Sequence, residues 1–270
     1  YRHQIGNNVY TLELGLMDIS EEEVVNELVP IVESYLNETL EIVSLKDSMH
    51  HLGYTSLVLK HQQNYSLQYG FQQYALEPLN CGDSFSAFHQ DNLHYLALSD
   101  GMGQGKMAAN ESKLTLEVLS KLILNGIGLK DTIDSINALL KIKNRNDMFT
   151  TLELCNINLA NARMKLIKYG ANPSYHIRSG MVEKIATNSL PVGVVSKLKM
   201  VSYEMPLKNN DLIIMSSDGT GNDFEQIVND NVHLYCDQHP QEIATFLMDQ
   251  VLEKNNLDDI SIIVIKVVNN

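Results

Sequence analysis

The feature that most constrains this chain is a glycine-rich acidic turn, Ser-Asp-Gly-Met-Gly at 99–103, which follows the apolar run at 93–98. Such a run is typical of a buried strand, so the turn sets the Asp100 carboxylate at a strand end. Its glycines let backbone and ligand approach closely. The pattern recurs where the apolar residues 212–215 lead through Ser216 into Ser-Asp-Gly at 217–219. One such turn is ordinary turn chemistry, but two predict a shared site where two strands end.

The acidic composition excludes several classes of partner. The 270 residues contain 20 Lys plus Arg against 33 Asp plus Glu, for a formal net charge of -13 at pH 7. Nucleic-acid phosphates and anionic lipids attract basic surfaces, so we expect this chain to bind neither. The length suits one large domain, or one domain with a smaller companion.

The cysteines and the apolar runs indicate the compartment. Cys81, Cys155 and Cys236 are isolated and have no zinc or redox spacing, which favours a reducing environment. No apolar run approaches the roughly 18 residues that a membrane span needs. We therefore expect a cytoplasmic protein. Because the chain starts at Tyr1 without an initiating Met, it can equally be the cytoplasmic part of a protein that upstream sequence anchors in a membrane.

Residues 1–75 predict a small N-terminal α/β segment. Ser20 and Glu23 form a capping box at the start of an amphipathic helix. Pro30 lies inside this helix and is expected to kink or divide it. The segment carries no chemical motif, so its position alone suggests a regulatory or linker role, and plain scaffolding fits as well. Its expected strands are 8–14, 54–60 and 64–72.

The remaining residues, 76–270, predict an α+β domain. Two amphipathic helices, at about 107–125 and 131–143, follow the glycine-rich turn. A last helix, at about 240–253, opens at Pro240, which suits a first-turn position. Turns of Asn-Ala, Asn-Pro and Ser-Gly type separate the strands and favour antiparallel pairing, with helices facing the sheets. The expected later strands are 149–158, 163–169, 174–178, 181–185, 199–205, 211–216 and 260–268.

Four aspartates lie next to apolar strands: Asp83, Asp100, Asp218 and Asp258. Any one of them alone is best explained as a turn residue. Strand ends in a layered domain can converge, however, and gathered carboxylates raise one another's pKa unless cations lie among them. Oxygen ligands without Cys or paired His favour Mg²⁺ or Mn²⁺ over Zn²⁺. Two such ions ~3.5–4 Å apart hold a bridging water as hydroxide and position a phosphoryl group for in-line attack.

Two other interpretations of the glycine-rich turn fail on spacing. A P-loop needs four residues between its first Gly and Gly-Lys-Ser/Thr, whereas three residues separate Gly101 from Gly105, and Met107 replaces the hydroxyl residue. A dinucleotide fingerprint needs Gly-x-Gly-x-x-Gly. The spacing here is Gly-x-Gly-x-Gly, and the acid before it would repel a pyrophosphate.

Six short motifs extend the pattern over about residues 75–270. They are Gly-Asp-Ser-Phe-Ser at 82–86, Ser-Asp-Gly-Met-Gly-Gln-Gly at 99–105, Phe-Thr-Thr-Leu-Glu-Leu at 149–154, Ser-Leu-Pro-Val-Gly at 189–193, Ser-Asp-Gly at 217–219 and Asp-Asp-Ile-Ser at 258–261. In order and spacing they resemble the metal-dependent (PPM, or 2C-class) protein serine/threonine phosphatases, most nearly a bacterial branch that acts in sporulation. The resemblance implies an α-β-β-α sandwich of two antiparallel sheets flanked by helices. The N-terminal segment resembles, less closely, the regulatory segment of that branch.

The resemblance also implies a role for each acidic residue. Asp100 would bridge two Mn²⁺ or Mg²⁺ ions, and the Gly101 carbonyl would complete the shell of one of them. Asp83 would serve one ion, and Asp218 with Asp258 would serve the other. Asp100 and Asp218 are thus the expected catalytic residues.

The chain departs from the class in several places. Met102 stands where many eukaryotic relatives have a His that is a candidate general acid, and their phosphate-binding Arg has no evident counterpart near Gly82. Asp259 stands where relatives often have Asn, so it ranks outside the ligand set. The helical hairpin at 107–143 would be a switch element whose position decides whether the metal site is complete.

The expected function is hydrolysis of phosphoserine on a protein partner. For the nearest relatives that partner is a phosphorylated anti-anti-sigma factor. Two alternatives remain open: a pseudophosphatase that acts as a regulatory binding module, and a phosphohydrolase of small molecules. Because regulated relatives can hold the site incomplete until dimerisation or partner contact, the resemblance also allows a homodimer.

Overall fold

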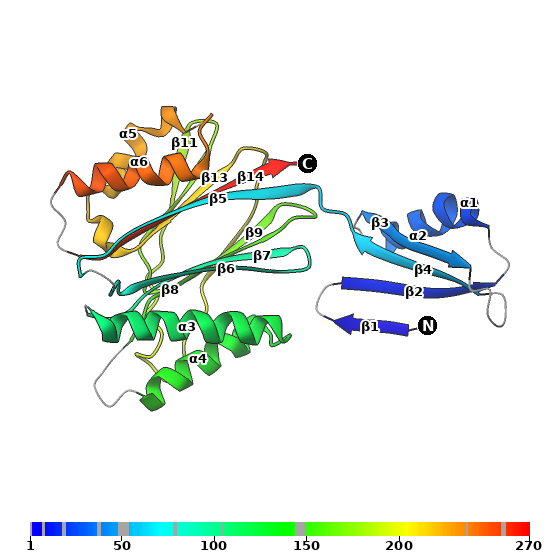
Figure 1. The fold of residues 1–270 in the computed structure, drawn as a ribbon, viewed down its shortest axis with the longest axis horizontal. Helices are drawn as coiled ribbons and strands as arrows, with labels where there is room; N and C mark the ends of the chain where they lie inside the picture. The colour runs from blue at the N-terminus through cyan, green and yellow to red at the C-terminus, as the bar shows by residue number, and fades with distance from the viewer. Residues whose placement is uncertain are drawn as a thin grey trace.

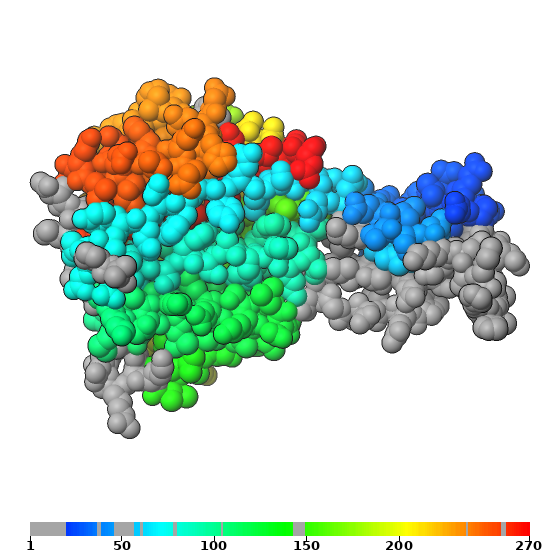
Figure 2. All heavy atoms as spheres, viewed as in Figure 1, coloured from blue at the N-terminus to red at the C-terminus, as the bar shows by residue number. Residues whose placement is uncertain are grey.

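The computed structural model describes residues 2–6, 9–17, 20–36, 39–47, 54–77, 80–103, 105–143, 149–235, 237–254 and 258–270. Its elements form a small N-terminal unit and a larger body, which are joined through β5 (Tyr65–Tyr74) (Figures 1 and 2). Cys81 and Cys155 are free thiols. Gln104 of the glycine-rich turn and Cys236 lie outside the described residues.

The N-terminal unit is a four-stranded antiparallel sheet with one helical segment on it. The strand order is β1-β2-β4-β3, and Val24, Leu57 and Leu59 belong to the buried cluster of this unit. Ser20 starts the helical segment through the predicted capping box with Glu23. The elements are β1 (Arg2–Gly6), β2 (Val9–Met17), α1 (Glu21–Glu23), the π-helix η1 (Val24–Leu28), α2 (Val29–Leu36), β3 (Leu40–Asp47) and β4 (Tyr54–His61).

The predicted division of this helix at Pro30 takes the form of a π-helical turn. In η1 the Val29 N–H donates to the Val24 carbonyl, five residues back. Pro30 follows directly and has no N–H, so it cannot make the regular helical hydrogen bond. The wider turn before the proline lets the helix continue into α2 instead of ending there.

The larger body is a sandwich of two five-stranded antiparallel sheets, which confirms the predicted fold class. Sheet I has the strand order β11-β10-β13-β14-β5, and sheet II has the order β12-β9-β8-β7-β6. The remaining strands are β6 (Asp83–Gln90), β7 (Leu93–Asp100), β8 (Leu152–Asn158), β9 (Arg163–Tyr169), β10 (Ser174–Arg178), β11 (Met181–Ile185), β12 (Ser202–Pro206), β13 (Leu212–Ser216) and β14 (Ile260–Asn269).

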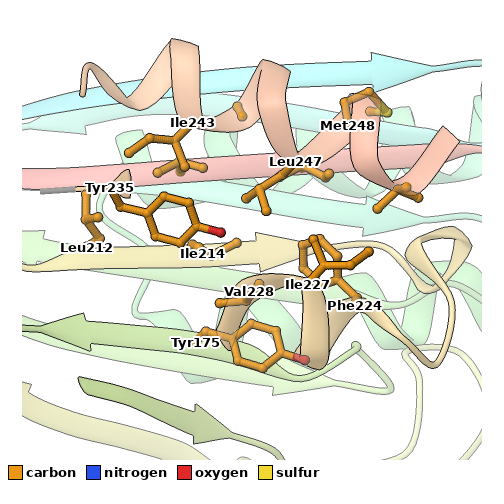
Figure 3. Close-up of a cluster of buried hydrophobic side chains, with 14 of the residues drawn as sticks. Tyr175, Leu212, Ile214, Phe224, Ile227, Val228, Tyr235, Ile243, Leu247 and Met248 are labelled. Carbon is orange, nitrogen blue, oxygen red and sulfur yellow. The ribbon is translucent and has the colours of Figure 1, made fainter. Parts of the chain in front are cut away.

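Helices cover the outer face of each sheet (Figure 1). The predicted hairpin, α3 (Lys106–Leu124) and α4 (Leu129–Lys143), packs on sheet II. On sheet I lie α5 (Phe224–Asp230), the short η3 (Val232–Leu234) and α6 (Pro240–Leu252), which opens at Pro240 as predicted. Figure 3 shows the core under α5 and α6, where Tyr175 of sheet I meets Phe224 edge to face at 5.8 Å. None of the helices in the described ranges is long and apolar enough to cross a membrane.

β5 belongs to sheet I, although the sequence prediction grouped this stretch with residues 1–75. It pairs with β14 along its whole length. On its outer edge the Gln241 amide of α6 bonds to both the N–H and the carbonyl of Phe71, at 3.1 Å each. We therefore propose that the larger body begins near residue 62 rather than at residue 76.

Candidate metal centre

Asp83 and Asp100 lie side by side in sheet II. β6 begins at Asp83, β7 ends at Asp100, and the two residues are direct partners in the antiparallel pair. Two threonines hold the Asp100 backbone. The Thr150 hydroxyl donates to its carbonyl (2.7 Å), and the Thr151 hydroxyl accepts its N–H (2.9 Å). The role of these threonines in holding Asp100 was not predicted from the sequence. The only sequence feature that indicates it is a pair of hydroxyl residues directly before an apolar strand.

Gly101 follows at the point where α3 packs against the end of β7. Its N–H donates to the Gly82 carbonyl (3.1 Å). A Cβ at this position would lie 2.2 Å from the Ala108 carbonyl oxygen, so only glycine allows the backbone of α3 to come this close. The sequence therefore needs glycine here for packing as well as for any approach of a ligand.

Asp218 and Asp258 come from sheet I, at the ends of neighbouring strands. Asp218 opens the 3-10 helix η2 (Asp218–Thr220) just after β13, and Asp258 lies just before β14. Two hydrogen bonds join these segments. The Ser217 N–H donates to the Ser261 carbonyl (3.0 Å), and the Ser261 N–H donates to the Ser217 hydroxyl (2.8 Å). The pairing of β13 with β14 thus brings these two carboxylates to one edge of the sheet.

Asp259 links the two sheets. Its carboxylate accepts the N–H of Leu76 (2.8 Å) and the N–H of Gly82 (2.6 Å). Because Gly82 precedes β6, this contact fixes the start of sheet II against the start of β14. Gly219 permits the same crowding, since a Cβ there would lie 2.0 Å from the Asp259 carbonyl oxygen. Backbone donors therefore occupy the Asp259 carboxylate, which was predicted to lie outside the ligand set.

Three of the predicted carboxylates line one groove, of about 470 Å³, that is open to solvent. Asp83 is the strand partner of Asp100 but lines a neighbouring hollow of about 370 Å³, which also contains Lys113 and Phe71. The tertiary structure thus gathers all five predicted residues at one end of the sandwich. The residues lining the groove are Asp100, Gly101, Met102, Gly103, Phe149, Thr151, Asp218 and Asp258.

Burial and mutual repulsion raise the pKa values of these carboxyls. The pKa of Asp100 rises to about 9, first through burial and then through the charges of Asp83, Asp218 and Asp258. The pKa of Asp83 rises to about 7, again mainly through burial, although two nearby serine hydroxyls act in the opposite direction. Burial and the charge of Asp258 also raise the pKa of Asp218. Without cations the centre therefore retains protons near neutral pH, and cations would favour its ionised form.

The Asp83 carboxylate tests whether a metal ion fits here. Both of its oxygens are buried, and neither has a hydrogen-bond partner of normal geometry among the described residues. A buried carboxylate without partners is strongly unfavourable, and a cation beside it would satisfy both oxygens. Within the described ranges no three His, Cys, Asp or Glu side chains stand as a ready-made ligand cluster. The fit therefore rests on the unpaired Asp83 oxygens and on the all-oxygen donor set, which suits Mg²⁺ or Mn²⁺.

Two antiparallel sheets under flanking helices, with carboxylates at one end of both sheets, define the class of PP2C-type (PPM) serine/threonine phosphatases. The comparison with solved structures agrees. The PP2C phosphatase domain with a fragment of the regulatory domain of the cell fate determinant SpoIIE from Bacillus subtilis matches with a TM-score of 0.84 and 27% identity. The match covers 99% of this chain and 81% of that chain.

The chain belongs to the stage II sporulation protein E (SpoIIE) family, whose model matches residues 90–268. Two curated proteins named Stage II sporulation protein E, from Bacillus subtilis (strain 168) and Priestia megaterium, are each 29% identical to it over 97% of this chain. The chain spans 34% of the first relative's length and 48% of the second's. The resemblance inferred from the six motifs is confirmed.

Proposed function

We propose that this chain is a metal-dependent protein serine/threonine phosphatase that hydrolyses phosphoserine on a protein partner. The observation that carries the proposal is the Asp83 carboxylate, which is buried, lacks a described hydrogen-bond partner and lies directly beside Asp100. With Asp218 and Asp258 it makes an all-oxygen donor set drawn from both sheets. The adjoining groove is open, which suits a phosphorylated side chain on a protein surface better than a small phosphoester that must be enclosed.

In this proposal Asp100, the Gly101 carbonyl and Asp83 would hold two Mn²⁺ or Mg²⁺ ions together with Asp218 and Asp258. Asp100 would be shared by both ions, Asp83 would serve one of them, and Asp218 with Asp258 would serve the other. When bound, the ions would activate water and neutralise the phosphoryl oxygens. RsbX, a more distant protein with the same fold (TM-score 0.60, 18% identity), has been solved in complex with magnesium.

The residues of the groove also constrain how the serine leaves. Met102, about half exposed, lines the groove at the position where eukaryotic relatives carry their candidate acid. A thioether has no proton to transfer, so protonation of the leaving serine falls to a group other than Met102. None of the described lining residues is Lys or Arg, so binding of the phosphate falls to the metal site.

The proposed substrate is a phosphorylated anti-anti-sigma-type protein. Support comes from the family, because the curated relatives are sporulation proteins. From the family resemblance we also propose that the N-terminal residues, 1–75 in the sequence prediction, are a regulatory segment. The resemblance leaves a homodimer as the alternative to a monomer. We propose a cytoplasmic location, either free or as the cytoplasmic part of a membrane-anchored protein.

The test is phosphate release from a phosphoserine protein, with the phosphorylated anti-anti-sigma protein of the same host as first substrate. We expect release in Mn²⁺ and none in EDTA. Asp218→Asn should lower the rate about 100-fold or more, because it removes a carboxylate that would hold one of the catalytic ions. Asp230→Asn, an exposed change at the end of α5, is the matched control and should leave the rate unchanged.

Each contrary outcome points to a different alternative. Hydrolysis that survives both EDTA and Asp218→Asn would refute the metal mechanism. Tight binding of the partner without any hydrolysis would support a pseudophosphatase. Faster hydrolysis of small phosphoesters than of any phosphoprotein would support a small-molecule phosphohydrolase.

A further inference from the structure

A buried ionic cluster lies between the two sheets, directly behind the candidate metal centre. Lys168 of β9 donates to Glu153 of β8 (2.5 Å) and to Ser174 of β10 (2.6 Å), and the Ser174 hydroxyl also donates to Glu153. The Lys168 and Glu153 side chains are 0% and 1% exposed. These three residues are called the Lys168 cluster below.

Such a cluster is unfavourable for stability, so its position calls for a reason. Desolvation of a buried ion pair often exceeds the Coulombic gain, and apolar residues of similar volume commonly stabilise a core at least as well. The second carboxylate oxygen of Glu153 is buried without a hydrogen-bond partner among the described residues, which adds to the cost. Glu153 shares a small cavity, of about 190 Å³, with Asp100 and Asp218. The unfavourable free energy of burying this ion pair therefore arises directly behind the metal centre.

Ser174 makes the cluster a link between the sheets. Glu153 and Lys168 are direct strand partners within sheet II, whereas Ser174 begins β10 in sheet I. Asp100 and Asp218 are divided in the same way, at the end of β7 in sheet II and just after β13 in sheet I. The hydrogen bond between Ser174 and Glu153 therefore crosses the gap across which these two carboxylates must be spaced to share a pair of ions.

Short stretches of chain, followed by hydrogen bonds, connect the cluster to the backbone at both carboxylates. In sheet II the hydroxyl and the N–H of Thr151 bind the N–H and the carbonyl of Asp100, at 2.9 Å each. On the side of sheet I the Asn172 amide donates to the carbonyl of Ser217, the residue before Asp218 (3.0 Å). Thr151 lies two positions before the glutamate of the cluster, and Asn172 lies two positions before its serine. Each sheet thus has a short connection from the cluster to the backbone at a proposed ligand. These two connections, through Thr151 and through Asn172, are called the backbone arms below.

We propose that the Lys168 cluster is a positioning device, which sets the spacing of Asp100 and Asp218 across the two sheets and thereby the affinity for the pair of ions. The inference rests on the proposed metal-dependent function. The cluster residues act through the backbone arms that end at the two aspartates.

The test is Mn²⁺ binding to the metal-free chain, measured by isothermal titration calorimetry. Ser174→Ala removes the hydrogen bonds by which the cluster reaches sheet I and leaves the ion pair within sheet II. Loss of an outer partner of a metal ligand typically weakens binding ~10–100-fold, so we expect the Mn²⁺ dissociation constant to rise at least about tenfold. The double variant Lys168→Met with Glu153→Leu, which leaves no lone buried charge, should have the same effect. Electron paramagnetic resonance should show weaker coupling between the two Mn²⁺ ions in both variants.

Asp211 supplies a matched control. It is 2% exposed, bonds to the buried His176 (3.1 Å) and to Arg178 (3.0 Å), and precedes β13 at the end opposite Asp218. Asp211→Asn should lower the unfolding temperature, because it weakens a buried charged network in the same sheet. It should leave the Mn²⁺ affinity within about twofold of wild type, since no hydrogen bond among the described residues leads from this network to the centre.

The wild-type titration separates the two proposals. If the wild-type chain binds no Mn²⁺, the proposed function and this inference both fail. If wild type binds Mn²⁺ and both cluster variants bind it equally well, the positioning role is wrong while the metal centre stands. An equal loss of affinity in Asp211→Asn would also overturn the positioning role, because the loss would then follow from general destabilisation.

Discussion

Burial of the carboxyls, reinforced by their mutual repulsion, dominates the chemistry of the metal-free centre. The folded pKa values of Asp100, about 9, and Asp83, about 7, both exceed the value of 3.8 for a free aspartate. The folded state therefore binds these protons more tightly than the unfolded chain. Their stabilising contribution is complete below about pH 3.8 and is lost as the pH rises through about 7 and then 9. At the scale of single residues, the fold tolerates this centre only when protons or cations neutralise it.

This charge balance predicts how stability depends on pH. In EDTA the unfolding temperature should fall as the pH is raised from 6 to 9, because the two carboxyls ionise without partners. Saturating Mn²⁺ should reduce the fall. Asp83→Asn should shrink the part of the fall near pH 7, since an amide does not ionise. A stability in EDTA that is constant or rises over this range, measured by calorimetry or circular dichroism, would contradict the prediction.

Among the helices, α3 packs closely against the centre at its start. The Ala108 carbonyl oxygen occupies the space that a side chain at Gly101 would need. The same helix buries Leu116 and Leu119 in the core over sheet II, which it shares with α4. A shift of the α3–α4 hairpin would thus directly change the packing against the Gly101 backbone. This contact gives a physical basis for the proposal, made from the resemblance, that the hairpin is a switch element.

Gly101→Ala tests that contact. The new Cβ would lie 2.2 Å from a backbone oxygen, so α3 must move, and we expect a loss of about 1–3 kcal/mol in the free energy of unfolding. Mn²⁺ affinity should fall as well, because Asp100 is the preceding residue. Gly103→Ala is the control: its φ of +85° costs about 1–2 kcal/mol, but nothing lies within 4 Å of the added Cβ. Denaturant titration and calorimetry check both effects, and equal Mn²⁺ binding by the two variants would contradict the coupling.

At the scale of the whole molecule, β5 follows the N-terminal unit in the chain and pairs with the last strand, β14. It forms the edge of sheet I by pairing with β14, and α6 packs across it. The small N-terminal sheet has a buried cluster of its own. The two parts therefore have separate cores, and the chain crosses from one to the other just before β5.

This arrangement predicts the outcome of two truncations. A chain that begins at residue 62 keeps β5 and should fold, with an unfolding transition as cooperative as that of the full chain. A chain that begins at residue 76 loses β5 and exposes the edge of β14, whose side chains are largely buried, so it should aggregate or unfold at lower temperature. Size-exclusion chromatography and thermal melting distinguish the two. Equal stability of both chains would show that the boundary near residue 62 is wrong.

Much of the fold and of the candidate site could be predicted because it is encoded in local patterns. The capping box at Ser20, the α3–α4 hairpin and the start of α6 at Pro240 follow from the spacing of apolar residues and from capping chemistry. The four aspartates could be named because each lies at the end of an apolar run. Asp218 is one of them, and its Ser-Asp-Gly turn repeats that of Asp100.

What only the tertiary structure decided is how distant segments meet. Local periodicity marks β5 as a strand but cannot say that its partner is β14, because strand pairing depends on contacts far apart in the chain. The same holds for the Asp259 carboxylate that holds Gly82, and for the Lys168 cluster that joins the two sheets. The sequence by itself thus determined which residues could carry the chemistry. The packing of one sheet on the other decided which of them are neutralised by partners and which, like Asp83, are left for a cation.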